Sequence, residues 1–390
     1  MNNYKLDMSR GKPSAEQLDL SVGLFNILAP FDYTSEDGTD CRNYGGLDGI
    51  PEMKRLFAEL MEMKPEEIFV GGNASLTLMY EALIEFCTRG AGKRKFLCPA
   101  PGYDRHFTMT EYLGFELIPI KMNATGPDMD EVRKWVADPS VAGIWCVPLF
   151  SNPQGIVYSD EVVREFASLK PAAADFRIFW DNAYMVHGFN RDAPGILNIL
   201  RECEMSGAED MVLVFSSFSK ISFPGAGVCA MAASAANLKR MREHMIVQSI
   251  GPDKLNQLRH VRYFKNAAGV WAHMDKISAI LRPKFAAVLD TLEARLGGKG
   301  VGTWLRPQGG YFVAFDTLPG RAKRTVELCA EKGLILTEAG ATYPYGRDPH
   351  DSNIRLAPTF PPLGQLEQAM EIFCWAVELA AKEGDKRGSS

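Results

Sequence analysis

The feature that most constrains the fold is an alternation of short apolar runs with amphipathic segments between residues 65 and 232. The apolar runs, which we predict to be strands, are 68–71, 95–98, 115–120, 143–147, 177–180, 211–215 and 227–232. Helical patterns lie between most of them, for example at 74–87, 128–137 and 160–169. Strands separated by helices of this length imply crossover connections. We therefore predict an α/β fold with a mostly parallel, seven-stranded sheet covered by helices on both faces.

The C-terminal third has a different pattern, which predicts a smaller α+β unit. It begins with a long helical region at 254–296, followed by a strand at 310–315. A helix at 322–332, strands at 334–336 and 353–356 and a helix at 363–381 follow. A chain of 390 residues favours two or three domains. We predict a large domain at 40–280 and a small domain formed by 1–39 and 281–390.

The composition excludes several classes of protein. Hydrophobic residues make up 46% and charged residues 23%, as in ordinary globular proteins. A net charge of −5 without a basic stripe argues against a nucleic-acid partner. No apolar stretch approaches the roughly 20 residues of a membrane span, and the N-terminus lacks the apolar region of a signal peptide. The chain is therefore expected to be cytoplasmic.

Cysteine and histidine spacing predicts no metal site. The eight cysteines are scattered singly, mostly inside apolar runs, and no CxxC pair occurs. We interpret them as buried, reduced thiols of a reducing compartment. The six histidines show no metal-ligand spacing.

Reactive residues follow several predicted strands directly, at the edge where ligands bind in sheets of this kind. Lys220 follows the strand at 211–215, in the sequence Ser217-Phe218-Ser219-Lys220. An amine placed there can be partly desolvated, which lowers its pKa and allows it to condense with an aldehyde. The alternative is a solvated loop lysine. Asp181 and Tyr184, after the strand at 177–180, could contact a protonated ring nitrogen and a phenolate, or Asp181 could simply cap a helix.

Two further turns complete the group of candidates. Asn152, in Ser151-Asn152-Pro153-Gln154-Gly155, either forms a plain turn or donates its amide to a ligand oxygen. Gly72, Asn73, Ala74 and Ser75 lie where a strand gives way to a helix, and helix N-termini bind phosphates. Together, a lysine, a carboxylate, a phenol, an amide and a phosphate site match the groups of pyridoxal 5'-phosphate.

The sequence also resembles the fold-type I pyridoxal-phosphate aminotransferases of class I and II over residues 10 to 380. The matching motifs are Asn43-Tyr44-Gly45-Gly46-Leu47-Asp48-Gly49, Ser151-Asn152-Pro153-Gln154-Gly155, Asp181-Asn182-Ala183-Tyr184, Ser217-Phe218-Ser219-Lys220 and Asn353-Ile354-Arg355-Leu356. Arg10-Gly11-Lys12-Pro13, Gly72-Asn73-Ala74-Ser75-Leu76 and Asn256-Gln257-Leu258-Arg259-His260 resemble a bacterial subgroup of aspartate aminotransferases and MocR-like aminotransferases.

The resemblance implies a role for each ring-contacting residue. Lys220 would carry the cofactor as a Schiff base and then move the proton between the substrate Cα and the cofactor C4′. Asp181 would pair with the pyridinium nitrogen, and Tyr184 and Asn152 would contact the 3′-oxygen. Tyr103 would stack on the ring.

The resemblance also implies substrate and partner contacts. Arg355 would bind the substrate α-carboxylate as a bidentate fork. Gly11 and Lys12 belong to a segment that would close over the substrate, in a site that Asn152 also lines. Tyr44 would reach the phosphate of the neighbouring subunit, which implies a homodimer with shared active sites.

One stretch departs from the family pattern. Most relatives have an arginine about eight residues after the Schiff-base lysine, where it contacts the phosphate, but here Pro224-Gly225-Ala226-Gly227-Val228 contains none. The phosphate charge would then be neutralised by a group elsewhere in the chain, or the phosphate would depend on backbone amides, the helix dipole and the hydroxyls of Ser217, Ser219 and Ser222.

The leading functional hypothesis is amino transfer between aspartate and 2-oxoglutarate by a ping-pong mechanism. Lys254, Arg259 and Arg262 are the candidates for binding the distal carboxylate of an acidic substrate. Alternatives are a transaminase for alanine or aromatic amino acids, or a β-lyase, because this fold supports all of them. A ligand-sensing regulator of the MocR type is disfavoured, since only about forty residues precede the Tyr44 motif and they are not basic.

Overall fold

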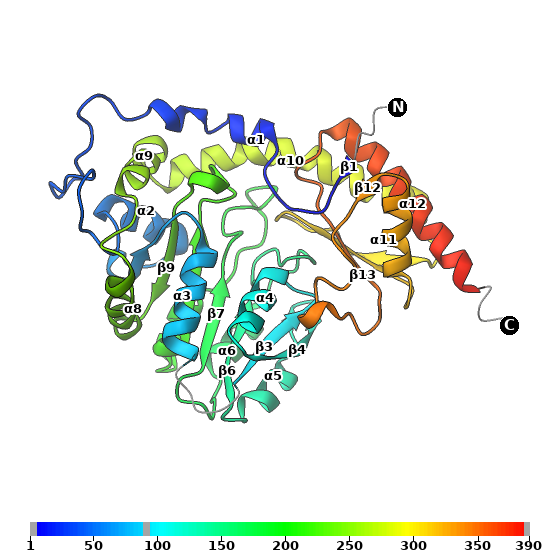
Figure 1. Ribbon diagram of the computed structural model, residues 1–390, viewed down its shortest axis with the longest axis horizontal. Helices are drawn as coiled ribbons and strands as arrows, with labels where there is room; N and C mark the ends of the chain where they lie inside the picture. Colours follow the sequence, from blue (N-terminus) through cyan, green and yellow to red (C-terminus); the bar gives the residue numbers. More distant parts are fainter. Residues whose placement is uncertain (1–5, 89–93, 386–390) are drawn as a thin grey trace.

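The computed structural model describes residues 6–88 and 94–385. Its centre is an eight-stranded sheet with the strand order β2-β9-β8-β7-β6-β3-β4-β5 (Figure 1). The strands are β2 (Ile68–Val70), β3 (Lys95–Ala100), β4 (Glu116–Asn123), β5 (Gly126–Pro127), β6 (Val141–Cys146), β7 (Arg177–Asp181), β8 (Val212–Ser217) and β9 (Cys229–Ala233). The four pairings that join β4, β3, β6, β7 and β8 are parallel, whereas β9 is antiparallel to both of its neighbours. The predicted α/β fold with a mostly parallel sheet is confirmed.

The predicted number of seven strands in this sheet was too low by one. The eighth strand, β5, has two residues and pairs antiparallel with the end of β4. Its two residues, Gly126 and Pro127, form no apolar run in the sequence, so pattern analysis could not detect this strand.

Both faces of the sheet are buried, because successive side chains of each strand point to opposite sides. In β7, Ile178 and Trp180 belong to one apolar cluster and Phe179 to the other. Helices α3 (Ser75–Cys87) and α8 (Ala235–Gln248) pack on the Phe179 side. The opposite face is covered by α2 (Pro51–Met61), α5 (Met129–Val136), α6 (Asp160–Ala167), α7 (Ile199–Met205), α9 (Lys254–Phe264) and α10 (Ala267–Leu296).

The C-terminal third forms two small sheets. Strands β10 (Gly302–Trp304), β11 (Val313–Thr317) and β13 (Asn353–Leu356) make one, and β1 (Leu6–Asp7) pairs with β12 (Leu334–Ile335) in the other. Helices α11 (Ala322–Glu331) and α12 (Leu363–Asp385) pack beside them (Figure 1). The strand predicted at 310–315 begins later, at Val313. Gly310 has a φ of +83°, outside the extended region, and its amide donates to the carbonyl of His187.

The helical region predicted at 254–296 is two helices. Helix α9 ends at Phe264, and Lys265 has a φ of +67°, which a continuing helix does not allow. The Asn266 side chain then caps α10 by accepting a hydrogen bond from the Gly269 amide at 3.0 Å. Helix α10 runs from the large sheet to the C-terminal sheets and passes through position 280 (Figure 1). The division into domains at 40–280 and at 1–39 with 281–390 stays a prediction.

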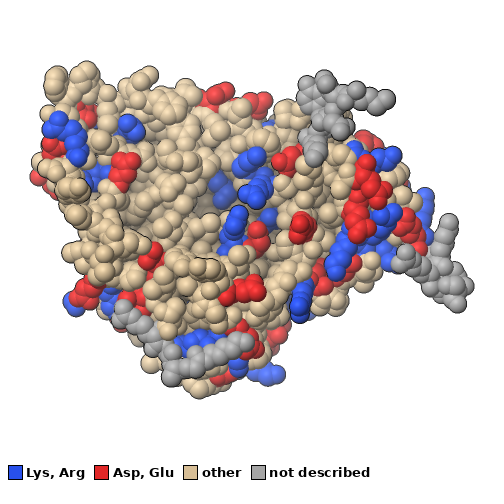
Figure 2. Space-filling model, in the orientation of Figure 1, with Lys and Arg blue, Asp and Glu red and all other residues tan. Residues whose placement is uncertain are grey.

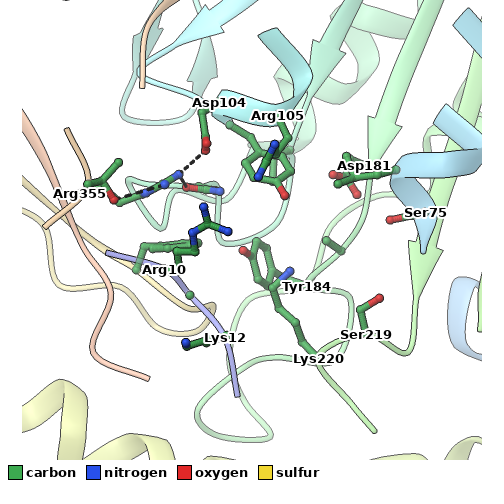
Figure 3. A pocket seen from close by; sticks show the side chains of 18 of the residues that line it. Arg10, Lys12, Ser75, Asp104, Arg105, Asp181, Tyr184, Ser219, Lys220 and Arg355 are labelled. Carbon is green, nitrogen blue, oxygen red and sulfur yellow. Dashed lines mark hydrogen bonds and ion pairs between the residues drawn. The ribbon is translucent and has the colours of Figure 1, made fainter. Parts of the chain in front are cut away.

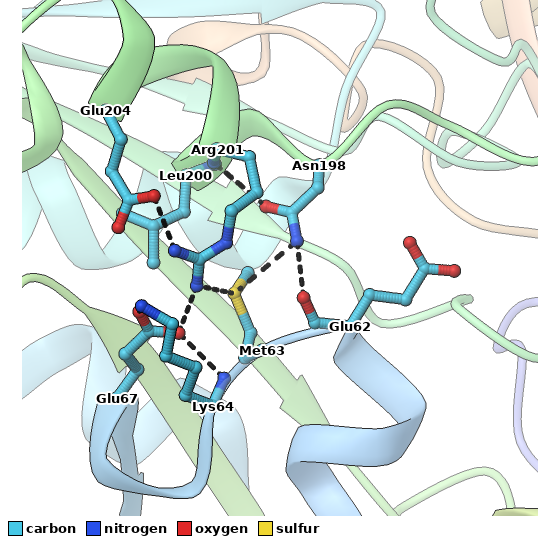
Figure 4. A network of polar contacts seen from close by, with 8 residues as sticks. All are labelled: Glu62, Met63, Lys64, Glu67, Asn198, Leu200, Arg201 and Glu204. Atoms are coloured by element: carbon cyan, nitrogen blue, oxygen red, sulfur yellow. Dashed lines mark hydrogen bonds and ion pairs between the residues drawn. The ribbon is translucent and has the colours of Figure 1, made fainter.

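A polar network fastens α7 to the turn before β2 (Figure 4). The Asn198 side chain caps α7 by accepting from the amides of Leu200 and Arg201, and its amide group donates to the Glu62 carbonyl at 2.7 Å. Arg201 forms ion pairs with Glu67 and Glu204. These contacts hold the connection that follows β7, the strand on which Asp181 lies.

The remaining helices are short. They are α1 (Ala15–Asp19) and α4 (Asp104–Tyr112), with 3₁₀ turns at Val22–Asn26, Pro65–Glu67, Glu209–Met211, Pro224–Ala226 and Pro344–Gly346. All eight cysteines are buried free thiols, as predicted. Within residues 6–88 and 94–385, no helix is both long and apolar enough to cross a membrane.

Candidate active site

A cavity of about 590 Å³ opens where the strands of the large sheet end and the C-terminal sheets begin. Figure 2 shows lysine and arginine side chains gathered around a hollow on this face of the molecule. Most of the residues predicted from the sequence line the cavity (Figure 3). They are Gly11, Lys12, Ala74, Ser75, Tyr103, Asn152, Asp181, Tyr184, Ser217, Ser219, Lys220 and Arg355.

Lys220 extends into the cavity between two aromatic rings. Its Nζ lies 5.0 Å from the ring centre of Tyr184 and 5.8 Å from that of Tyr311. Burial lowers the pKa of the Lys220 amine from its ordinary value, and the charge of Asp181 opposes part of this shift. A lowered pKa increases the fraction of neutral amine, which is the nucleophilic form that attacks a carbonyl.

Asp181, the last residue of β7, is only 4% exposed and is oriented by His106. Its Oδ2 lies 3.0 Å from His106 Nε2, and the imidazole stacks on Trp145 with the ring centres 4.1 Å apart. An ionised carboxylate only accepts, so Nε2 must be the donor in this pair. The other oxygen, Oδ1, is buried and has no partner within the described chain. A buried acceptor without a partner is costly, which suits an oxygen kept for a donor on a ligand.

Hydroxyls and a helix start lie at another part of the cavity. Ala74 is the N-cap residue of α3 and supplies no side-chain cap, and the start of this helix, Ala74 to Leu76, lines the cavity. Ser217 and Ser219 adjoin them, with their hydroxyl oxygens 3.1 Å apart. Helix N-termini with hydroxyl groups bind phosphates. Ser222 does not contribute, because its hydroxyl is buried against His260 Nε2 at 2.8 Å.

Besides Ser222, three residues predicted to contact the cofactor do not line the cavity. The Gly72 carbonyl accepts from the Cys229 amide, and the Asn73 side chain donates to the Pro224 carbonyl, so both hold neighbouring loops in place. Gly72 and Asn73 face a separate hollow of about 140 Å³. Tyr44 is 80% exposed and lies away from the cavity of its own chain.

Arg355, on β13, brings a nearly buried guanidinium to the cavity, with 6% of the side chain exposed. Its Nη1 forms an ion pair with Asp104 at 2.7 Å and also donates to Asn152 Oδ1 at 3.4 Å. The Nε atom is buried and has no partner in the part of the chain that the structure describes. The Nε–H group of Arg355 is therefore still available to donate to a carboxylate in the cavity.

The three cations proposed for a distal carboxylate lie outside this cavity. Lys254 is buried and donates to the carbonyls of Asn43 and Gly45 at 2.8 and 2.6 Å. Arg262 pairs with Asp32 at 3.1 Å, and Arg259 borders the smaller hollow beside Gly72. Lys254 and Arg262 hold other parts of the chain in place, and Arg259 is separate from the cavity.

Several site residues were missed by sequence reasoning: Asp104, Arg105 and Arg10 line the cavity, and His106, which does not line it, contacts Asp181. Asp104, Arg105 and His106 follow Tyr103 directly at the start of α4, and β3 ends just before them. The strand-end rule that found Asp181 could have found these three, because they occupy the same edge of the sheet. Arg10 lines the cavity from the N-terminal segment. From the sequence it was named only as part of the motif Arg10-Gly11-Lys12-Pro13 and was given no role of its own.

The N-terminal segment passes close to the cavity wall and is fixed there by the C-terminal third. A Cβ on Gly11 would lie 2.4 Å from the Phe312 ring, so only glycine fits this approach. The carbonyl of Lys12 accepts from Thr359 Oγ1 at 3.0 Å, and its ammonium lies 3.8 Å above the Phe360 ring. This segment is therefore part of the site.

Comparison with known proteins agrees with this geometry. The sequence pattern of the family described as aspartate amino-transferase matches residues 1–388. The chain belongs to this family. An aspartate aminotransferase of Corynebacterium glutamicum is 44% identical over 98% of this chain and 90% of that protein. A crystal structure of an aspartate transaminase from the same species has a TM-score of 0.95 at 43% identity, covering 98% and 92% of the two chains.

A more distant solved structure shares the fold. The α-aminoadipate aminotransferase of Thermus thermophilus, complexed with N-(5'-phosphopyridoxyl)-L-leucine, has a TM-score of 0.79 at 19% identity over 96% of this chain and 92% of that one. The protein is thus an aminotransferase of fold type I, as the sequence motifs predicted. No group of three metal-ligating side chains occurs among the residues described.

Proposed function

We propose that this aminotransferase uses pyridoxal 5'-phosphate to transfer the amino group between aspartate and 2-oxoglutarate. The observation that supports it most is one cavity in which Lys220, the free Oδ1 of Asp181 and the free Nε of Arg355 come together. These groups match an aldehyde, a pyridine nitrogen and a substrate carboxylate.

The residues present fit the cofactor from end to end. Ser75, Ser217, Ser219 and the start of α3 would hold the phosphate, and Asp181 would keep a proton on the ring nitrogen. When bound, the protonated ring supplies an electron sink that stabilises negative charge at the substrate Cα. Tyr103 lines the cavity beside these groups and would lie against the ring.

Lys220 and Tyr184 would handle protons and charge around the ring. Among the residues that the structure describes, Lys12 and Lys220 are the lysines that line the cavity, and the lowered pKa of Lys220 suits an amine that takes and returns a proton at the substrate Cα. Burial raises the pKa of the Tyr184 phenol well above its ordinary value, so it stays protonated and donates to an anionic oxygen.

Arg355 would bind the α-carboxylate of the substrate. Asp104 and Asn152 fix one side of its guanidinium, which limits the rotamer entropy lost when a carboxylate binds. Aspartate as the donor is supported by the C. glutamicum relative, whose name states that activity.

We also propose a homodimer with shared active sites. Large apolar side chains are exposed in and near the N-terminal segment, namely Val22, Phe25, Phe31 and Tyr44, and in the α8 region, namely Ile246, Val247 and Ile250. Phe31 and Tyr44 are 84% and 80% exposed, which is unusual for aromatic rings on a monomer. A second copy covering this surface would place Tyr44 near the phosphate end of the partner's cavity.

We further propose that the protein works in the cytoplasm. Each of the eight cysteines is a buried thiol, and burial raises the pKa of Cys98 and Cys146 well above the ordinary value. Thiols of this kind persist in a reducing compartment.

A half-reaction screen tests the function. Each amino acid is added to the cofactor-loaded protein, and the loss of the cofactor's visible absorbance is followed with time. We expect the highest kcat/KM with aspartate and glutamate. Faster conversion by alanine or aromatic amino acids would replace the aspartate assignment with one of those transaminase activities.

A further inference from the structure

The cavity contains more positive charge than the residues around it neutralise. Its cationic side chains are Arg10, Lys12, Arg105, Lys220 and Arg355. Arg355 pairs with Asp104, and Lys12 lies over the Phe360 ring. Arg10 and Arg105 take part in no side-chain hydrogen bond or ion pair within the described residues.

The acidic residues of the cavity do not balance these two arginines. Asp104 is paired with Arg355, and Asp181 accepts from His106. Glu338 also lines the cavity, but it is exposed and no ion pair joins it to a cation among residues 6–88 and 94–385. Two unpaired guanidinium groups at one cavity favour a ligand with a negative charge between them.

The positions of the two arginines point to the substrate rather than the cofactor phosphate. In Figure 3, Ser75 and Ser219 lie on one side of the view, and Arg10 lies toward Arg355 on the other. Arg105 descends from α4 into the space between Asp104 and Tyr184. Both arginines line the same cavity as Arg355, where the α-carboxylate is expected.

The backbone holds both arginines in place before a ligand binds. On either side of Arg10, the Ser9 carbonyl accepts from Thr337 Oγ1 at 2.6 Å, and Gly11 lies against Phe312. Arg105 stands between Asp104 and His106, and both of these neighbours are fixed by buried partners. Binding a carboxylate would therefore order only the side chains.

We propose that Arg10 and Arg105 together bind the distal carboxylate of a dicarboxylic substrate and so make the enzyme selective for acidic amino acids and oxo acids. This inference rests on the proposed function and assigns its specificity to residues other than Lys254, Arg259 and Arg262. In this arrangement Arg355 binds the α-carboxylate of the substrate, and Arg10 and Arg105 bind its distal carboxylate.

Steady-state kinetics of Arg10→Gln and Arg105→Gln test the proposal. Each variant should lose about tenfold to hundredfold in kcat/KM with aspartate and glutamate, the range for one lost charge-assisted contact. With alanine, the same variants should stay within about threefold of the unmodified enzyme. Arg10→Lys should lose less kcat/KM with acidic donors than Arg10→Gln does, because lysine keeps the positive charge but lacks the planar guanidinium fork. Arg259→Gln is the matched control, because Arg259 is separate from this cavity, and it should not change the selectivity.

A binding measurement keeps the test independent of turnover. Succinate and butyrate are titrated into the cofactor-loaded enzyme, and the change in the cofactor absorbance reports binding. Arg10→Gln and Arg105→Gln should weaken succinate about tenfold or more and leave butyrate unchanged. Equal effects on both acids would overturn the proposal, and so would loss of cofactor from the variants, which would assign the arginines to the phosphate.

An enzyme with a different function and an enzyme with a different carboxylate site give different results in these assays. If the unmodified enzyme does not convert aspartate or glutamate, the proposed function is wrong. If it converts them and both arginine variants keep the same ratio of acidic to neutral donors, the function stands and only the assignment of Arg10 and Arg105 is wrong.

Discussion

Replacing Asp181 by asparagine separates the charge of this residue from its structural role. Asparagine has nearly the same shape, and its side-chain oxygen can still accept from His106 Nε2, the contact observed at 3.0 Å. The Oδ1 position, which is buried and unpartnered, would lose its negative charge. We therefore expect the variant to fold and bind the cofactor but to hold the ring nitrogen in its protonated form poorly.

The size of the effect follows from this geometry. A hydrogen bond between charged groups contributes about 1.5–3 kcal/mol, which corresponds to a drop of roughly tenfold to more than hundredfold in kcat/KM. Asp181→Ala should show the same kinetic loss and also lower the free energy of unfolding by about 1–3 kcal/mol, because His106 would be buried without a partner.

The assay compares both variants at saturating pyridoxal phosphate. Amino transfer from aspartate gives kcat/KM, the visible spectrum gives the cofactor content, and urea unfolding gives the stability. Asp181→Asn with nearly normal kcat/KM would refute the reasoning, because the residue would then act only by fixing the loop after β7.

Three further predictions concern single side chains. Lys220→Ala should abolish the linkage that borohydride reduces, and mass spectrometry of the reduced protein should find the pyridoxyl group on no other lysine. Arg355→Lys should raise the KM for acidic and neutral donors alike, because an ammonium cannot reproduce the planar fork; an increase for acidic donors alone would contradict this. Burial and the nearby charge of Lys220 lower the pKa of His187 to about 3, below the roughly 6.5 of the unfolded chain, so stability should fall as pH falls from about 6.5 towards 3. Urea titrations should show that His187→Phe reduces this loss of unfolding free energy at low pH. If the free energy of unfolding of the variant depends on pH as that of the unmodified protein does, His187 is not the group responsible.

The large sheet was predictable because of its two-faced burial. Strands such as β7 alternate Ile178, Phe179 and Trp180 between two apolar clusters, so the whole strand appears as one apolar run. Strands β1 and β5 have two residues each and leave no such run. The break between α9 and α10 was also missed, because the apolar pattern continues across Lys265 although its backbone does not.

The candidate site was partly predictable for a related reason. Asp181, Ser217 and Lys220 lie at or just after strand ends, and parallel strands end at the same edge. Sequence spacing could not show that Lys254 would donate to two backbone carbonyls, because those carbonyls lie about two hundred residues away in the chain. A cation in the sequence shows that charge is available, and only the fold shows where that charge is used.

The start of α4 places a constraint on how this protein can change. Tyr103, Asp104, Arg105 and His106 are consecutive. The first three line the cavity, Asp104 pairs with Arg355, and His106 contacts Asp181. Each residue of a helix turns the chain by about 100°, so inserting or deleting one residue here would misdirect all four side chains together. A substitution therefore changes the contacts of one side chain, whereas a length change alters those of all four. We therefore expect related enzymes that differ in substrate preference to differ in the side chains at positions 103–106 and to keep the length of this segment.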